Sequence, residues 1–278
     1  MGYKRKVEWL LMNEEFAWFL GTLLSDGSIT IPKYRSKGDE THIQYCIHIK
    51  DVECLHKIKE ILGTSAIVHE YPDYKSPQCR LRVYDRKDIT TQYANIKSEI
   101  PSDIQGYERH FIRGIVDGDG CLNYRPSRDT FRINIINEKL NIVQWCAQAI
   151  TDNLGIPYKE PKHIEYDHIY KIEYEGRVGC LIAWWLYHGD IDNCVLKRKY
   201  DYYKHYVLHD IDSIDNDETL LEAVKCIYIN ENHISPNINA SKTLEWCHYI
   251  QRQLSFNTVP VFHNKGKTKY YELYIPQP

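Results

Sequence analysis

The sequence predicts an α+β protein made of two similar halves, with a small αβ appendage at the C-terminal end. Two helical runs, residues 19–27 (FLGTLLSDG) and 112–120 (IRGIVDGDG), both end in Asp-Gly, and their aspartates at 26 and 119 lie 93 positions apart. Each run is followed by strands, a helix, further strands and another helix. A repeat of this length is too long for a solenoid and indicates a duplicated domain.

The two Asp-Gly endings are unfavourable for a helix taken alone. A helix C-terminus carries partial negative charge, which repels an aspartate by about 0.3–1 kcal/mol. The glycine that follows suits the left-handed residue just past a helix end. Two aspartates at matching positions, Asp26 and Asp119, therefore suggest an added positive charge, most simply a shared metal ion.

Small residues four apart lie on one face of each run: Gly21 and Ser25 in the first, Gly114 and Gly118 in the second. Such spacing lets two helix backbones approach closely. The two runs are therefore expected to pack against each other as a helix interface that brings both aspartates together.

The first half continues with alternating strands on either side of a helix. Residues 42–49 (HIQYCIHI) alternate strictly, as expected for a half-buried strand. Residues 50–63 predict an amphipathic helix that stops at Gly63. Residues 78–84 (QCRLRVY) form another alternating strand, with Cys79, Leu81 and Val83 facing inward.

The second half repeats this order. Residues 132–155 predict a strand and then a helix ending in glycine, residues 168–176 a strand, residues 181–189 a helix, and a basic stretch follows from Leu196. We divide the chain into halves at 1–104 and 105–208, an acidic linker at 209–222 and an appendage at 223–278. In the appendage, residues 245–254 resemble 144–154 and precede a hairpin, which indicates a degenerate, partial third repeat.

The two Asp-Gly runs resemble the signature of the LAGLIDADG homing endonucleases, in the form with both motifs on one chain. The resemblance covers roughly residues 8–207, with Thr22 and Ser25 as mild departures. It implies a pseudo-twofold duplicated αββαββα fold, in which two saddle-shaped antiparallel sheets lie along the DNA major groove.

The resemblance also implies the residues of a metal-dependent site. Asp26 and Asp119 would bind the metals, with help from the backbone carbonyls of Ser25 and Gly118. Mg²⁺ is the expected ion, Mn²⁺ also fits, and Ca²⁺ is expected to bind without supporting cleavage. Family members place a catalytic lysine late in each half, which suggests Lys97 and Lys197, and a water-ordering polar residue after the first long strand of each half, which suggests Asp51 and Asn137.

Polar residues on the solvent-facing sides of the strands are the candidates for DNA contact, because Arg, Lys, Gln and Asn read base edges in the major groove. In the first half they are Lys33, Arg35, Lys37, Gln44, His48, Lys75, Arg80 and Arg82. In the second half they are Asn123, Arg125, Arg128, Arg132, Asn134 and Lys171.

Composition limits the class of protein only weakly. The net charge of −3 argues mildly against nucleic-acid binding, yet six acids fall within residues 210–222, and phosphate binding depends on local charge. No apolar run approaches the roughly 18 residues of a membrane span, the amino terminus lacks a signal-peptide core, and nine scattered cysteines indicate reduced thiols. We therefore expect an intracellular monomer, in a bacterial, phage or organellar host, that does not contact a membrane.

The function expected from these features is site-specific cleavage of double-stranded DNA at a long asymmetric target, by an intron-encoded or otherwise mobile enzyme. Two alternatives stay open at this stage. One is a maturase or splicing cofactor that binds intron RNA on the same fold. The other is a DNA-binding regulator that does not cleave, although two intact aspartates argue against it.

Overall fold

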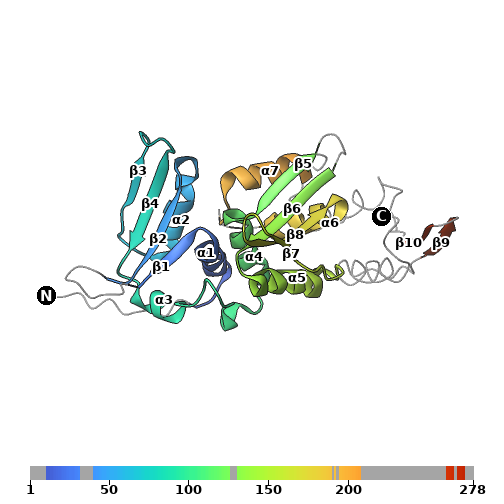
Figure 1. Cartoon of the computed structure of the whole chain (residues 1–278), viewed down its shortest axis with the longest axis horizontal. Coiled ribbons are helices and arrows are strands. Elements are labelled where there is room, and N and C mark those ends of the chain that lie inside the picture. The colour runs from blue at the N-terminus through green and yellow to red at the C-terminus, as the bar shows by residue number, and fades with distance from the viewer. Residues whose placement is uncertain are drawn as a thin grey trace.

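The computed structural model describes residues 11–31, 40–125, 130–189, 191, 194–207, 261–265 and 268–272. Two four-stranded antiparallel sheets lie on either side of a central pair of helices (Figure 1). The predicted α+β fold with two duplicated halves is confirmed. The predicted linker at 209–222 and the helix at 245–254 lie outside the described residues.

The first half runs from a central helix through two pairs of strands. Its elements are α1 (Glu14–Ser25), β1 (Gly27–Thr30), β2 (His42–His48), the 3₁₀ helix η1 (Ile49–Asp51), α2 (Val52–Leu62), β3 (Val68–Tyr71), β4 (Gln78–Val83), α3 (Lys87–Gln92) and the 3₁₀ helix η2 (Ser102–Ile104). The sheet order is β1-β2-β4-β3, and α2 packs on its inner face.

The second half repeats this arrangement and adds one helix. Its elements are α4 (Glu108–Gly118), β5 (Cys121–Arg125), β6 (Thr130–Asn137), α5 (Leu140–Leu154), β7 (Lys162–Ile164), β8 (Ile169–Glu175), α6 (Gly176–Tyr187) and α7 (Lys197–Val207). Its sheet order, β5-β6-β8-β7, matches the first, so each half has the αββαββα order. The predicted division after residue 104 falls between η2 and α4; as a domain boundary it stays a prediction.

Alternation decides which face of each sheet is buried. In the first sheet Ile43 pairs with Val83 and Tyr45 with Leu81, and all four side chains are buried. The side chains between these buried residues point outward, because successive side chains of a strand alternate between the two faces of the sheet. Core residues of both halves join in one continuous cluster through α1 and α4, so the halves share a core rather than touching at a surface.

Helix ends follow local signals, with one exception. Asn13 caps α1 by accepting a hydrogen bond from the Phe16 amide at 2.8 Å. Gly63 and Gly155 end α2 and α5 in the left-handed conformation, at φ +56° and +64°. The predicted left-handed role for the glycines of the Asp-Gly endings is wrong, because the residues with positive φ do not include Gly27 or Gly120.

Close packing explains those two glycines instead. A Cβ on Gly27 would lie 2.9 Å from the Leu23 Cα atom. A Cβ on Gly120 would lie 2.6 Å from the Val116 Cα atom and 2.8 Å from the Asn134 carbonyl oxygen. Each glycine therefore lets the chain turn sharply from a central helix into the first strand of its sheet.

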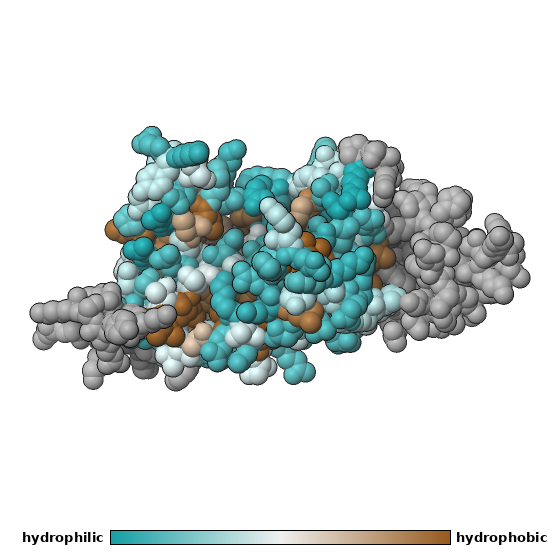
Figure 2. Space-filling view, viewed as in Figure 1, coloured by the Kyte–Doolittle hydropathy of each residue, from teal (hydrophilic) through white to brown (hydrophobic). Residues whose placement is uncertain are grey.

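Part of the C-terminal appendage is described. Strands β9 (Val261–Lys265) and β10 (Thr268–Glu272) pair in an antiparallel hairpin, as predicted. In the described residues no helix is long and apolar enough to cross a membrane. On the face seen in Figure 2 the described surface is mainly hydrophilic, and its hydrophobic residues form separate small patches.

Candidate active site

The small residues of α1 and α4 let the two helices touch along their backbones. A Cβ on Gly21 would lie 2.1 Å from the Phe111 carbonyl oxygen, and one on Gly114 would lie 2.2 Å from the Trp18 carbonyl oxygen. A Cβ on Gly118 would lie 2.0 Å from Ser25 Oγ. The structure thus brings together all four residues predicted for the helix interface.

Asp26 and Asp119 are the C-terminal cap residues of α1 and α4, so the paired helices end with their carboxylates side by side. Burial raises the pKa of Asp26. Burial, and then the negative charge of Asp26, raise the pKa of Asp119 to about 6. Two buried carboxylates with raised pKa values at the ends of neighbouring helices are candidate ligands for a cation.

Lys97 lies beside these aspartates, in the turns that follow α3. Its ammonium donates hydrogen bonds to the carbonyl oxygens of Leu24 at 2.6 Å and Ser25 at 2.8 Å. Burial lowers its pKa, whereas the charges of Asp119 and Asp26 act in the opposite direction. The structure therefore brings Lys97 together with both aspartates, and its catalytic role stays a prediction.

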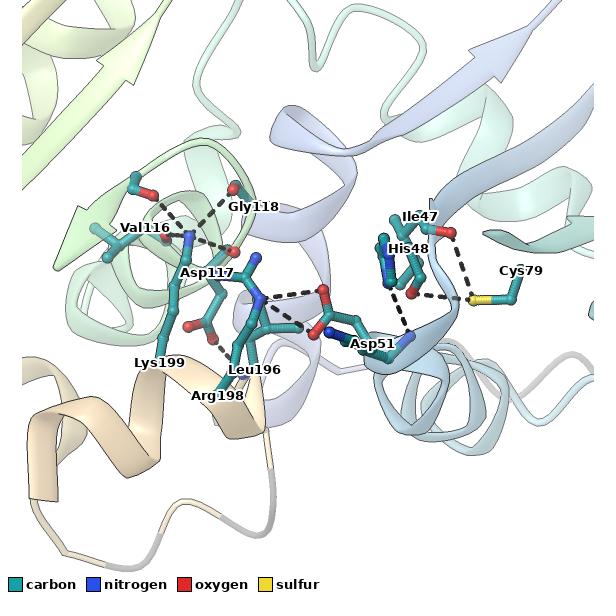
Figure 3. Close-up of polar contacts among 12 residues, drawn as sticks. Ile47, His48, Asp51, Cys79, Val116, Asp117, Gly118, Leu196, Arg198 and Lys199 are labelled. Carbon is teal, nitrogen blue, oxygen red and sulfur yellow. Dashed lines mark hydrogen bonds and ion pairs between the residues drawn. The ribbon is translucent and has the colours of Figure 1, made fainter. Parts of the chain in front are cut away.

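The second lysine at the site is Lys199, which corrects the predicted position. Lys197 is exposed in the first turn of α7 and pairs with Asp201. The Lys199 ammonium is buried and donates to the carbonyl oxygens of Asp117 at 2.7 Å and Gly118 at 3.1 Å, as well as to two flanking carbonyls (Figure 3).

The two lysines are equivalent. The carbonyls that bind Lys97, at positions 24 and 25, correspond through the 93-residue repeat to those at 117 and 118 that bind Lys199. Lys199 points to a different side of α7 from the residues just before it. It shares the buried side of the helix with Tyr203, four residues later.

Asp117 is a buried carboxylate that the sequence prediction did not use. It accepts hydrogen bonds from Trp18 Nε1 and the Tyr187 hydroxyl, both at 2.8 Å, and from the Leu196 amide at 3.1 Å. Burial raises its pKa, against these hydrogen bonds and the charge of Lys199. It ties α1, α6 and the start of α7 to α4, and so fixes the helix that carries Lys199.

The polar residues after the first long strands are arranged differently from the prediction. Asn137 is buried, and its Oδ1 accepts a hydrogen bond from the Lys139 amide at 2.9 Å. The residue beside it, Glu138, is exposed and contributes to raising the pKa of Asp119. Asp51 is bound across the interface by Arg198, with both carboxylate oxygens 3.2 Å from Nε (Figure 3).

The donor set for a metal ion is small. Among the described residues no cluster of three or more His, Cys, Asp or Glu side chains could hold a metal. The predicted oxygen ligands at the helix ends are the carboxylates of Asp26 and Asp119 and the carbonyls of Ser25 and Gly118. In this structure those two carbonyls accept hydrogen bonds from Lys97 and Lys199. Hard oxygen donors of this kind fit Mg²⁺, Mn²⁺ or Ca²⁺.

No protein-family model matches the sequence, and a search of curated proteins also found no match. Among solved structures, the LAGLIDADG homing endonuclease I-GzeII in complex with its DNA target is 13% identical, covering 80% of this chain and 99% of its own, with a TM-score of 0.47. I-SmaMI, bound to uncleaved DNA in the presence of calcium ions, is 10% identical, covering 77% and 97%, with a TM-score of 0.45. The N-terminal LAGLIDADG domain of DUF199/WhiA is 11% identical, covering 68% and 91%, with a TM-score of 0.44.

The chain has a duplicated αββαββα fold, and these solved structures resemble it over most of their own length. Its two motif helices are α1 and α4, and its two sheets present their outward faces on either side of them. The likenesses concern the fold, since none of these structures exceeds 13% identity.

The outward faces of the two sheets hold most of the predicted DNA-contact residues. Gln44, Arg80 and Arg82 lie on the first face, and Lys75 lies in the turn between β3 and β4. The second face holds Asn123, Arg125, Arg132, Asn134 and Lys171. Lys33, Arg35, Lys37 and Arg128 lie outside the described residues.

Two of these candidates are less available than the sequence suggests. His48 caps η1, with Nδ1 accepting a hydrogen bond from the Lys50 amide at 3.1 Å. Asn134 is buried although its strand position faces outward. Both residues are therefore poorer candidates for base contact than Gln44 or Arg82.

Replacing Lys199 by Met is expected to lower DNA cleavage by about 10²-fold, because a buried positive charge beside both aspartates is lost. Unfolding free energy should fall by about 1–3 kcal/mol, since four carbonyls lose a donor. The matched variant Lys197→Met should leave both quantities unchanged, because its side chain is exposed. Single-turnover cleavage and urea unfolding measure the two effects. A loss of cleavage in Lys197→Met but not in Lys199→Met would return the catalytic role to Lys197.

Calcium affinity is expected to fall as the pH drops through about 6. The raised pKa of Asp119 means that its carboxyl takes up a proton near that pH, and a cation binds only the ionised form. Below it, affinity should weaken by about tenfold per pH unit for one competing proton. Calorimetric titration of the DNA-free protein with calcium chloride checks this; affinity that is constant from about pH 7 to about pH 5 contradicts it.

Proposed function

We propose that this protein is a site-specific DNA endonuclease that hydrolyses both strands of a long asymmetric target with divalent metal ions. The observation that carries the proposal is the duplicated centre at the joined ends of α1 and α4. There each helix ends in an aspartate, and each aspartate has a lysine bound to the carbonyls that precede it. Two equivalent centres suit a duplex, since one can serve each strand.

The protein groups fit a metal-dependent reaction. When bound, a divalent ion supplies an activated water and stabilises charge on the phosphate. Asp26 and Asp119 would hold such ions, because burial raises the pKa of both carboxyls and a bound cation would favour their ionised forms. Mg²⁺ is the proposed physiological ion, with Mn²⁺ as a substitute and Ca²⁺ as a ligand that does not support cleavage.

The lysines would act on the phosphate from two sides of the centre. Lys97 and Lys199 carry positive charge next to both aspartates in a site that limits water. Preplaced charge of this kind stabilises the extra negative charge of a phosphodiester transition state. Each lysine is held by backbone carbonyls, so little reorganisation is needed when DNA binds.

The sheets would bind the DNA on either side of the centre. A two-stranded ribbon fits the major groove, and outward side chains such as Gln44 and Arg82 suit base edges or phosphates. The outward cations offset the small negative net charge of the whole chain. An intracellular, monomeric and intron-encoded protein stays our prediction from the sequence.

Cleavage selection on a randomised duplex library tests the proposal. The full chain is incubated with the library and magnesium, and parallel reactions contain calcium or EDTA. We expect one family of long asymmetric sites to be cut on both strands with magnesium only. A sequence-selective bound pool that is never cut would instead indicate a DNA-binding regulator, and preferential capture of intron RNA with splicing activity would indicate a maturase.

A further inference from the structure

The two sheets carry opposite charges at one equivalent position. Two residues after each aspartate, Ser28 and Cys121 begin matching rows across the strands. Ser28 pairs with Gln44, which pairs with Arg82. In the other half the row ends differently: Cys121 pairs with Asn134, which pairs with Glu173.

The first of these rows ends in an arginine held by neutral groups. Arg82 Nε donates a hydrogen bond to Gln44 Oε1 at 3.0 Å. The neighbouring Arg80 lies over the ring of Tyr71, 5.1 Å from its centre. No Asp or Glu occupies an outward position on the described strands of this sheet. No carboxylate on this face therefore pairs with either arginine, and both could bind DNA.

The second row ends in a carboxylate that holds two cations. Glu173 Oε2 accepts hydrogen bonds from Arg132 at 2.9 Å and from Lys171 at 2.8 Å. Glu173, Arg132 and Lys171 form a charged triad, and beside it Arg125 pairs with Glu175 at 3.3 Å. Partial burial opposes ionisation of Glu173, but the two donors outweigh it and hold its pKa at about 2. The triad is therefore a fixed, fully charged feature of the outward face.

Opposite charges select opposite base edges in the major groove. An arginine favours the two acceptors of guanine, whereas a carboxylate accepts only from the amino groups of cytosine or adenine. A carboxylate also repels phosphates, and here it occupies two cations that would otherwise bind them. The two sheets therefore differ in what they attract at the same step from the centre.

Resting on the proposed function, which puts both outward faces in the major groove, we propose that Arg82 and Glu173 are paired specificity determinants. Arg82 selects a guanine acceptor edge, and Glu173 selects an amino-bearing edge at the equivalent step on the other side of the centre. If each residue reads the nearer base, a palindromic target presents the same base at both steps and satisfies only one of them. This pair of positions therefore favours an asymmetric target.

Binding selection in calcium tests the proposal without requiring cleavage. The full chain, Arg82→Gln and Glu173→Gln are each used to select from a randomised duplex library. We expect each variant to lose discrimination at one position only, and the two positions to lie at equal distances from the centre of the site. Glu60→Gln, which makes the same charge change on the exposed face of α2, should select the wild-type site.

Affinity for a short duplex of mixed sequence gives a second readout. Glu173→Gln frees Arg132 and Lys171 for phosphates, so affinity should rise by about tenfold and the salt dependence should steepen by about one to two phosphate contacts. Glu60→Gln should change neither.

The outcomes separate the inference from the proposed function. Unchanged base preferences in both variants, with normal binding by the wild type, overturn the inference alone. A wild-type protein that selects a site in calcium but never cuts it with magnesium overturns the endonuclease and leaves the paired determinants standing. A wild-type protein that binds no DNA overturns both.

Discussion

Asp26→Asn and Asp119→Asn are each expected to lower double-strand cleavage by about 10³-fold or more, while the protein stays folded and binds its target. Asparagine keeps the shape of aspartate but removes the negative charge that holds a cation at the helix ends. The aspartates are helix caps rather than groove-facing strand residues, so DNA affinity should change little. Plasmid cleavage with magnesium and gel-shift binding with calcium measure the two quantities.

Stability provides an independent check on the same variants. Because burial and the negative charge of Asp26 raise the pKa of Asp119, removing the Asp119 charge in Asp119→Asn should leave the melting temperature equal or higher. Asp152→Asn is the matched control, since Asp152 is exposed on α5 and bonds only to Gln148 among the described residues. Full cutting by both active-site variants would overturn the metal assignment, and a large loss of stability would show that the aspartates serve the fold instead.

Local patterns were enough to predict the central helices and the main strands. Small residues at a spacing of four and the two Asp-Gly endings predicted the contact of α1 with α4, and strict alternation predicted β2 and β4. The edge strands β1, β3 and β7 are three or four residues long, too short to show a period of two clearly. Their positions depend on pairing with central strands, which is not a local property of the sequence.

The site residues that sequence missed depend on contacts between distant segments. Lys197, Arg198 and Lys199 are all basic, so the sequence alone does not distinguish them. Only Lys199 lies on the side of α7 that faces the carbonyls of α4. That phase is set where the Leu196 amide meets Asp117, 79 residues away. One signal was visible beforehand: the sixth position of the motif is Asp117 in one run and Leu24 in the other, so the second half had to supply a partner for a buried charge.

Gly21→Ala and Gly114→Ala are expected to destabilise the protein by about 3 kcal/mol or more each. Each new Cβ would meet backbone of the opposite helix, at 2.1 Å from the Phe111 carbonyl oxygen and 2.2 Å from the Trp18 carbonyl oxygen. Neither oxygen can move without shifting its helix. A loss of this size should lower the melting temperature by about 10 °C in a protein of this length, and calorimetry measures it.

Helix propensity alone predicts the opposite sign, because replacing glycine by alanine inside a free helix would stabilise that helix by about 1 kcal/mol. The third close contact gives a control that can be repaired. Gly118→Ala meets the Ser25 side chain, with Oγ at 2.0 Å, rather than backbone. Adding Ser25→Gly should therefore restore most of the stability lost in Gly118→Ala, whereas Ser25→Gly should not rescue Gly21→Ala. If Gly21→Ala and Gly114→Ala were as stable as the wild type, α1 and α4 could not be in backbone contact, and the aspartates at their ends would not share one site.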